Sequence, residues 1–106
     1  MTVLRWTEQA VQDLESIRDF IERDSPRYGR LVVERLVEAT SRIEVFPKSG
    51  RMVPEVGRED VRELIVGDYR IVYRLADELA VLITVYRSSM LFPYHLVDEY
   101  AGGCAL

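Results

Sequence analysis

In the first half of the chain, apolar residues recur at the three- and four-residue spacing that is typical of amphipathic helices. One stripe consists of Ala10, Leu14, Ile17 and Ile21, and a second consists of Val32, Leu36, Ala39 and Ile43. Thr7 is a candidate N-cap for the first helix, and Ser25-Pro26 opens the second with a cap followed by a proline. Residues 47–50 contain the proline and glycine that end it. Because the two helices are separated by only a few residues, they are predicted to pack as an antiparallel hairpin.

The second half of the chain changes to the two-residue period of β-strands. Residues 61–66 and 69–75 flank Gly67-Asp68, which is a signal for a two-residue hairpin turn. This turn pairs Arg62 with Tyr73 on the face that packs against the helices, where the stem of Arg62 could lie on the ring. A further short strand is predicted before the first helix, at residues 3–6.

The opposite face of this hairpin carries charged residues. The same register places Glu63 diagonally between Arg70 and Arg74, within reach of both. These arginines could be anchors for an acidic partner. They are equally consistent with a charge ladder on the protein surface.

A third strand is predicted at residues 79–86, where almost every side chain is apolar. Such a run indicates burial on both faces and a central place in the sheet. A three-residue connection at 76–78 would set Thr84 opposite Arg70, whereas a connection of two or four residues would set Val85 there. The pattern does not choose between these registers.

The remaining segments are predicted to be irregular. Residues 51–60 contain Pro54 and Gly57 and have no period, so we expect a loop. From Arg87 onward the chain is amphipathic, and Pro93 is expected to interrupt any helix. This tail is expected to lie across the exposed face of the sheet, because four of its apolar residues need cover: Leu91, Phe92, Leu96 and Val97.

The element order therefore predicts a small α+β fold of strand, two helices, three strands and a tail. A helical hairpin would cover one face of a mainly antiparallel sheet. Residues 1–100 are expected to form a single domain, and residues 101–106 a disordered C-terminal tail. The chain length of 106 residues is that of one ordinary domain.

Composition narrows the classes of function. The 18 acidic and 14 basic residues give a net charge of −4, which argues against a broad basic surface for nucleic acid. All basic residues except Lys48 are arginines, which cannot act as general bases near neutral pH. The single Cys104 and single His95 exclude an internal disulfide and a site of several Cys or His ligands for a metal, and no cofactor is expected.

No apolar run is long enough to span a membrane and no signal peptide is recognised, so a cytoplasmic location is expected. Composition favours a binding protein, or an enzyme that uses arginine and tyrosine.

Four stretches in order resemble the ParE/RelE superfamily of type II toxin–antitoxin toxins. The most specific stretch is 61–74, with its Arg-Glu-Leu before the hairpin turn and Tyr-Arg after it. The others are residues 6–17, 46–51 and 81–87, and the resemblance covers about residues 3–90. It implies the RelE/ParE-like fold and a cognate antitoxin that binds and neutralises this chain in a hetero-oligomer.

The resemblance implies two alternative targets. RelE-like members cut messenger RNA in the ribosomal A site, whereas ParE-like members, linked to plasmid stabilisation, inhibit DNA gyrase without cutting anything. Arg70 matches the arginine that follows the hairpin in the nucleases, Tyr94 falls near their tail tyrosine, and Arg87 is close to their tail arginine. The lysines of their first hairpin strand are absent, and Glu63 stands where RNA would need a cation. We therefore favour gyrase inhibition, with the nuclease as the alternative and an inactive family member as a third possibility.

The contacts to antitoxin or target are predicted on the charged sheet face and the apolar tail. The sheet edge left by the hairpin could accept a strand, and the tail could offer a groove for an amphipathic segment. The candidate residues are Arg62, Arg70, Arg74, Arg87, Leu91 and Phe92.

Overall fold

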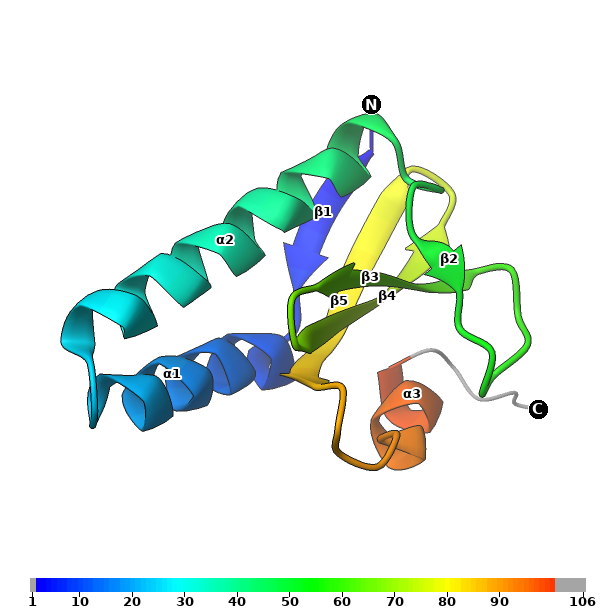
Figure 1. The fold of residues 1–106 in the computed structure, drawn as a ribbon. Coiled ribbons are helices and arrows are strands. Elements are labelled where there is room, and N and C mark those ends of the chain that lie inside the picture. Colours follow the sequence, from blue (N-terminus) through cyan, green and yellow to red (C-terminus); the bar gives the residue numbers. More distant parts are fainter. Residues whose placement is uncertain (1, 101–106) are drawn as a thin grey trace.

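The computed structural model describes residues 2–100, and these form an α+β fold of five strands and three helices. In chain order the elements are β1 (Val3–Trp6), α1 (Glu8–Glu22), α2 (Pro26–Val45), β2 (Arg51–Met52), β3 (Val61–Val66), β4 (Tyr69–Ala76), β5 (Leu79–Arg87) and α3 (Tyr94–Tyr100). The sheet has the order β1-β5-β4-β3-β2 and is antiparallel except for the pairing of β1 with β5 (Figure 1). The predicted fold class is confirmed. The predicted C-terminal tail, residues 101–106, lies outside the described residues.

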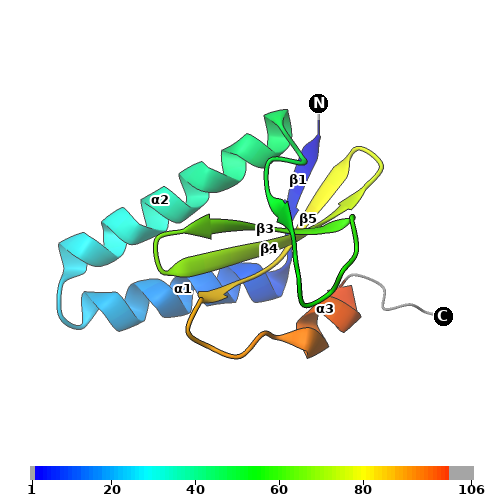
Figure 2. The ribbon, with the colours of Figure 1, turned by 45° about the vertical axis from the view of Figure 1, so that its right-hand side comes forward.

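The helical hairpin forms as the sequence predicts (Figure 2). The hydroxyl of Thr7 accepts a hydrogen bond from the Ala10 N–H at 3.1 Å, and that of Ser25 accepts one from the Tyr28 N–H at 3.3 Å. Both helices begin at these caps because the first backbone N–H groups of a helix have no partner within it. Their apolar stripes pack on one face of the sheet, in a core that includes Ala10, Leu36, Ile43, Leu64, Ile71 and Leu82.

The register of the β3–β4 hairpin is confirmed residue by residue. Val66 pairs with Tyr69 and Arg62 pairs with Tyr73 across the two-residue turn. Gly67 adopts a φ of 59°, a backbone conformation that residues other than glycine rarely adopt. The turn and the alternating pattern together fix which side chains face the helices.

Both predicted registers for β5 are wrong. The turn has two residues, Asp77 and Glu78, but a β-bulge follows in which Leu82 pairs with Tyr73 and Thr84 pairs with Val72. Ile83 is the extra residue and has no partner on β4. Each residue of β5 after it therefore pairs one position away from where an uninterrupted ladder would place it. Arg70 therefore faces Tyr86 rather than Thr84 or Val85. The strand lies between β1 and β4, so it is an interior strand, although the central strand of the five is β4 rather than the predicted β5.

The two segments predicted to be irregular both contain regular structure. In 51–60, β2 pairs with β3 and forms the edge of the sheet, because residues 51 and 52 reach the open side of β3 directly after the turn. In the tail, Pro93 precedes a helix instead of preventing one. Its carbonyl accepts the hydrogen bond from the Val97 N–H at 3.3 Å, and the missing N–H of a proline costs nothing at a helix start.

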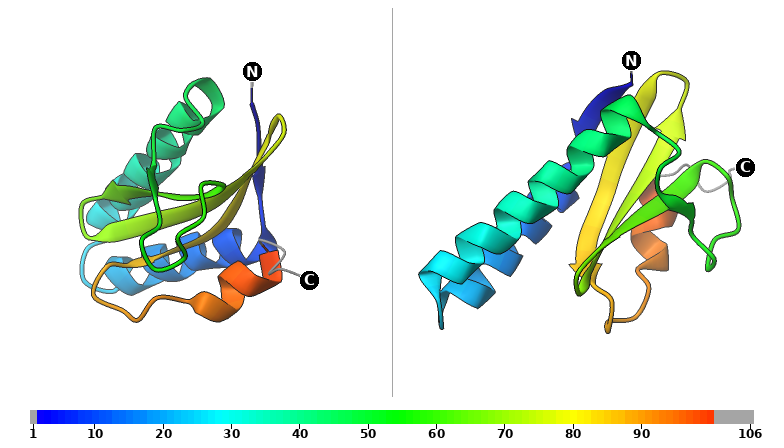
Figure 3. Two further views of the ribbon diagram at one scale, coloured as in Figure 1. Left: turned by 90° about the vertical axis from the view of Figure 1, so that its right-hand side faces the viewer. Right: turned by 45° about the horizontal axis from the view of Figure 1, so that its top comes forward.

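The tail covers the second face of the sheet, as expected. Helix α3 lies on the side of the sheet away from the α1–α2 hairpin (Figure 3). It contributes to a second core cluster made of Val53, Val61, Val72, Ile83, Tyr86 and Val97. The sheet is thereby buried on both faces near its centre.

Candidate partner-binding site

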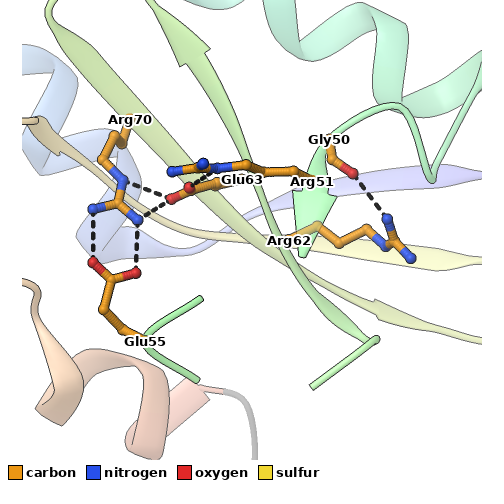
Figure 4. A network of polar contacts seen from close by, with 6 residues as sticks. All are labelled: Gly50, Arg51, Glu55, Arg62, Glu63 and Arg70. Atoms are coloured by element: carbon orange, nitrogen blue, oxygen red, sulfur yellow. Dashed lines mark hydrogen bonds and ion pairs between the residues drawn. The ribbon is translucent and has the colours of Figure 1, made fainter. Parts of the chain in front are cut away.

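A buried carboxylate lies at the centre of the charged sheet face. Glu63 is only 1% exposed, and it receives Arg70 Nε at 2.6 Å and Arg51 Nε at 2.5 Å (Figure 4). Arg70 comes from the neighbouring strand β4, and Arg51 is the direct cross-strand partner of Glu63 on β2. A buried carboxylate needs this pairing because an unpaired charge in the interior is very costly.

A second carboxylate completes the network. Glu55, from the loop between β2 and β3, accepts hydrogen bonds from Nη1 and Nη2 of Arg70 at 3.1 and 3.0 Å. These hydrogen bonds raise the pKa of Arg70 and hold the pKa of the Glu55 carboxyl below its ordinary value of 4.5. The Arg70 guanidinium also lies 5.4 Å from the Tyr86 ring centre and 5.5 Å from that of Phe92. Its side chain is about one-tenth exposed, so carboxylates and aromatic rings enclose it.

The prediction for Glu63 is half right. It binds Arg70 but not Arg74, which instead pairs with Asp60 at 3.4 Å. Asp60 lies directly before β3, next to Arg74, whereas β2 brings Arg51 to the remaining oxygen of Glu63. Burial opposes ionisation of Asp60, but the hydrogen bond and charge of Arg58 hold its pKa below the ordinary value. The surface charge ladder is excluded for Glu63 and Arg70, because both are buried.

Arg62, the cross-strand partner of Tyr73, donates hydrogen bonds to backbone carbonyls. Its Nη1 donates to the Gly50 carbonyl at 2.9 Å and its Nε to the Glu59 carbonyl at 3.0 Å. The Tyr73 hydroxyl accepts from the Gly50 N–H at 3.0 Å and donates to the Pro47 carbonyl at 2.7 Å. Both side chains therefore hold the turn after α2 against the sheet.

Three of the other four predicted residues are exposed. Arg87 is exposed at the end of β5 and has no ion pair within residues 2–100, while Leu91 is 94% exposed. Phe92 is half-buried, and the exposed Tyr94 packs against its ring at 4.8 Å. The structure thus separates the candidate residues into a closed network around Arg70 and an exposed surface that includes Arg87 and Leu91.

The geometry limits what this site can do chemically. The Arg70 donors are occupied by two carboxylates, so they do not present a free cation to phosphate. Burial raises the pKa of Tyr86 to about 12, so its phenol stays protonated near neutral pH. Within residues 2–100, no cluster of three or more His, Cys, Asp or Glu is placed to hold a metal ion. None of the described helices has the length and apolar character needed to cross a membrane.

Sequence reasoning missed three residues of this arrangement. Glu55 and Arg51 lie in the segment without a period, so no periodicity predicted their contacts with Arg70 and Glu63. Asp13 lies on α1 among other charged residues that carry no periodic signal, although its carboxylate binds the Thr84 hydroxyl and the Val85 N–H. The only available signal was its place beside the apolar stripe.

Comparison with known proteins identifies the family. Residues 4–92 match the family model described as the ParE toxin of the type II toxin–antitoxin system parDE. The chain is 34% identical to the protein Y4kP of Sinorhizobium fredii, over 78% of this chain and 85% of that protein. It is 32% identical to toxin RelE2 of Caulobacter vibrioides, over 86% of this chain and the whole of that protein. The chain belongs to the ParE toxin family of the ParE/RelE superfamily.

The fold comparison agrees. A structure of the chromosomal ParDE TA system from P. aeruginosa superposes with a TM-score of 0.69 at 22% identity, covering 82% of this chain and 96% of that one. The predicted RelE/ParE-like fold is therefore confirmed.

Proposed function

We propose that this toxin acts by binding and inhibiting DNA gyrase, as a protein inhibitor rather than an enzyme, and that a cognate antitoxin neutralises it. The family match supports the ParE-like branch. We further propose that it acts in the cytoplasm, in a module that can stabilise a plasmid.

The pairing of Arg70 with Glu63 and Glu55 is the observation on which the proposed target rests. An RNA-cleaving site needs cations for the charge that develops on phosphorus. Glu63 and Glu55 instead neutralise the arginine that would provide it. A binding inhibitor needs no free cation here, so the closed network fits a structural role for Arg70.

The test is a DNA supercoiling assay with purified gyrase, run beside a messenger RNA cleavage assay on translating ribosomes. Loss of supercoiling with intact message is expected. Message cut in the A site with normal supercoiling would reverse the proposal. Glu55→Gln is the informative variant, because it removes one of the two carboxylate charges from Arg70 and one of the two acceptor oxygens of residue 55, and it should leave gyrase inhibition unchanged.

A RelE-like nuclease remains the second candidate function. The observation that favours it is the exposure of Arg87 and Tyr94 near the end of β5 and the start of α3, together with the match to a toxin named RelE2. In that reading Arg70 would become available only after Glu55 moves away. Cleavage that Glu55→Gln accelerates and Arg87→Ala abolishes would support it over the gyrase proposal.

An antitoxin partner is supported by the family and by an open strand edge. Strand β2 pairs with residues 62 and 63 of β3, and within residues 2–100 no strand pairs with Leu64–Val66 on the outer side. Ile65 in this stretch is 54% exposed. An antitoxin strand could pair there and form a hetero-oligomer.

Toxicity separates these functions from the third possibility. Growth arrest on induced expression, relieved by co-expression of the antitoxin, is expected for an active toxin. Normal growth with stable, soluble protein would indicate an inactive member that functions only within a complex.

A further inference from the structure

An apolar groove of about 750 Å³ lies between the turn that follows α2 and the turn that joins β4 to β5, two segments that lie next to each other near the top of Figure 1 and Figure 2. Its apolar lining consists of Val45, Phe46, Pro47 and Leu75, and it is named the Phe46 groove. Phe46 is 66% exposed and Val45 is 58% exposed. None of these residues belongs to the network around Arg70. Exposed apolar surface of this kind is typical of a protein-binding site.

The turn that carries Phe46 is held in place by hydrogen bonds. The Ser49 N–H donates to the Phe46 carbonyl at 2.9 Å, and the Tyr73 hydroxyl donates to the Pro47 carbonyl at 2.7 Å. Tyr73 is fully buried in the core, so it fixes this turn to the sheet. A surface that is ordered before it meets its partner loses less conformational entropy on binding. The Phe46 groove is therefore already formed in the free toxin.

One cation and one anion lie on opposite walls of the Phe46 groove. Lys48 belongs to the turn after α2 and Asp77 to the turn between β4 and β5, and both are exposed. Among residues 2–100 neither of them forms an ion pair. An acidic partner would pair with Lys48 but be repelled by Asp77, and a basic partner would meet the reverse. A second copy of this chain, related by a two-fold axis, brings the same two charges in the opposite order and complements both.

We propose that two copies of this chain associate through the Phe46 groove in a two-fold symmetric contact. Lys48 of each copy pairs with Asp77 of the other, and each Phe46 ring enters the apolar space of the opposite groove. The net charge of −4 on each copy opposes this association only weakly, because repulsion between exposed charges is screened beyond about 8 Å at physiological salt. The inference does not depend on whether gyrase or messenger RNA is the target.

The test measures the mass of the purified full-length toxin by sedimentation equilibrium over a range of concentrations. A reversible shift from the mass of one chain toward that of two is expected as the concentration rises. Phe46→Ala is expected to raise the dissociation constant of the dimer by about tenfold or more, as for the anchor of an interface. Phe20→Ala removes a similarly exposed ring from α1, 58% exposed, and should leave the dissociation constant within about twofold.

Charge reversal tests the two-fold pairing. Lys48→Glu alone sets two acidic groups against each other at both contacts, and Asp77→Lys alone sets two cations against each other, so each variant should be a monomer. An equimolar mixture of the two variants restores an opposite pair at both contacts and should form a mixed dimer. Arg27→Glu reverses an exposed charge on α2 and should associate like the wild type.

Circular dichroism and thermal unfolding check that each variant folds. Asp77 has a φ of 55°, so if Asp77→Lys does not fold, Phe46→Ala and Lys48→Glu decide the outcome. A wild-type toxin that is monomeric at every concentration would overturn the proposal, and so would a dimer that both of these variants leave unchanged. If the wild type stays monomeric and Phe46→Ala weakens binding to antitoxin or gyrase, the groove belongs to that partner and the proposed dimer is wrong.

Discussion

The carboxylate of Asp13 on α1 accepts a hydrogen bond from the hydroxyl of Thr84 on β5, and the same oxygen accepts the Val85 N–H at 3.1 Å. Thr84 follows directly after Ile83, the extra residue of the β-bulge. At the bulge residue itself, the Thr7 hydroxyl donates to the Ile83 carbonyl at 3.0 Å. Helix α1 and its N-cap Thr7 therefore supply partners to backbone groups of β5 that lie beyond the end of its pairing with β1. The bulge in turn sets Tyr86 opposite Arg70.

Asp13→Ala is predicted to destabilise the fold by about 2 kcal/mol, because it leaves the Val85 N–H and the Thr84 hydroxyl without their acceptor. Asp13→Asn should cost less, since its amide oxygen can still accept both hydrogen bonds. Urea unfolding measures the free energy of each variant. Asp19→Ala on the same helix is the control, because the Asp19 side chain is 66% exposed and its removal should change stability by less than about 0.5 kcal/mol. Equal effects at both positions would contradict the role given to Asp13.

Glu63→Ala is predicted to destabilise the protein by about 3–5 kcal/mol, because it leaves the charge of Arg70 buried with one partner fewer. Arg51→Ala should cost much less, since the Arg51 side chain is 57% exposed and water can take its place on Glu63. Denaturant unfolding of the two variants gives the comparison. A loss below about 1 kcal/mol for Glu63→Ala would show that the network is not essential for stability.

Stability is predicted to depend on pH through Glu55. Its pKa in the folded protein is below the ordinary value of 4.5, so unfolding takes up a proton in the acid range. The stabilising contribution is therefore complete above about pH 4.5 and is lost as the pH falls through the folded pKa. The difference in unfolding free energy between wild type and Glu55→Gln should be largest near neutral pH and shrink in acid. Glu15→Gln, at an exposed position of α1, should give no such change, and a difference that stays constant with pH would refute the prediction.

Gly50→Ala is predicted to cost about 2 kcal/mol or more, since a methyl group there would lie 2.6 Å from both the Glu63 carbonyl oxygen and the Tyr73 hydroxyl. The first of these atoms belongs to the backbone of β3 and cannot move without disturbing the sheet. Gly67→Ala is the matched comparison, because it has open space around it and only the strain of a φ of 59°. That strain should cost about 1 kcal/mol. Thermal unfolding that ranks Gly67→Ala as the more damaging change would disprove the close packing of Gly50.

The sequence determined the helical hairpin and the β3–β4 pairing by itself. Caps, stripes and the Gly67-Asp68 turn are local signals, and each fixes its structure within a few residues. The same turn gave the register that places Glu63 near Arg70, so half of the charged network could be predicted. Alternation of apolar and charged residues then assigned each side chain to a face.

Only the tertiary structure decided the rest. Strand β5 is apolar at nearly every position, so a one-residue bulge leaves no trace in its pattern. The groups that bond its backbone at and after the bulge, Thr7 and Asp13, are more than 70 residues away in the sequence. Glu55 reaches Arg70 through a loop whose course follows from its packing rather than from any period. Local periodicity specifies elements and faces, whereas the pairing of charges depends on contacts between segments far apart in the chain. For that reason the sequence by itself determined the fold class, and the tertiary structure decided that Arg70 is enclosed while Arg87 is exposed.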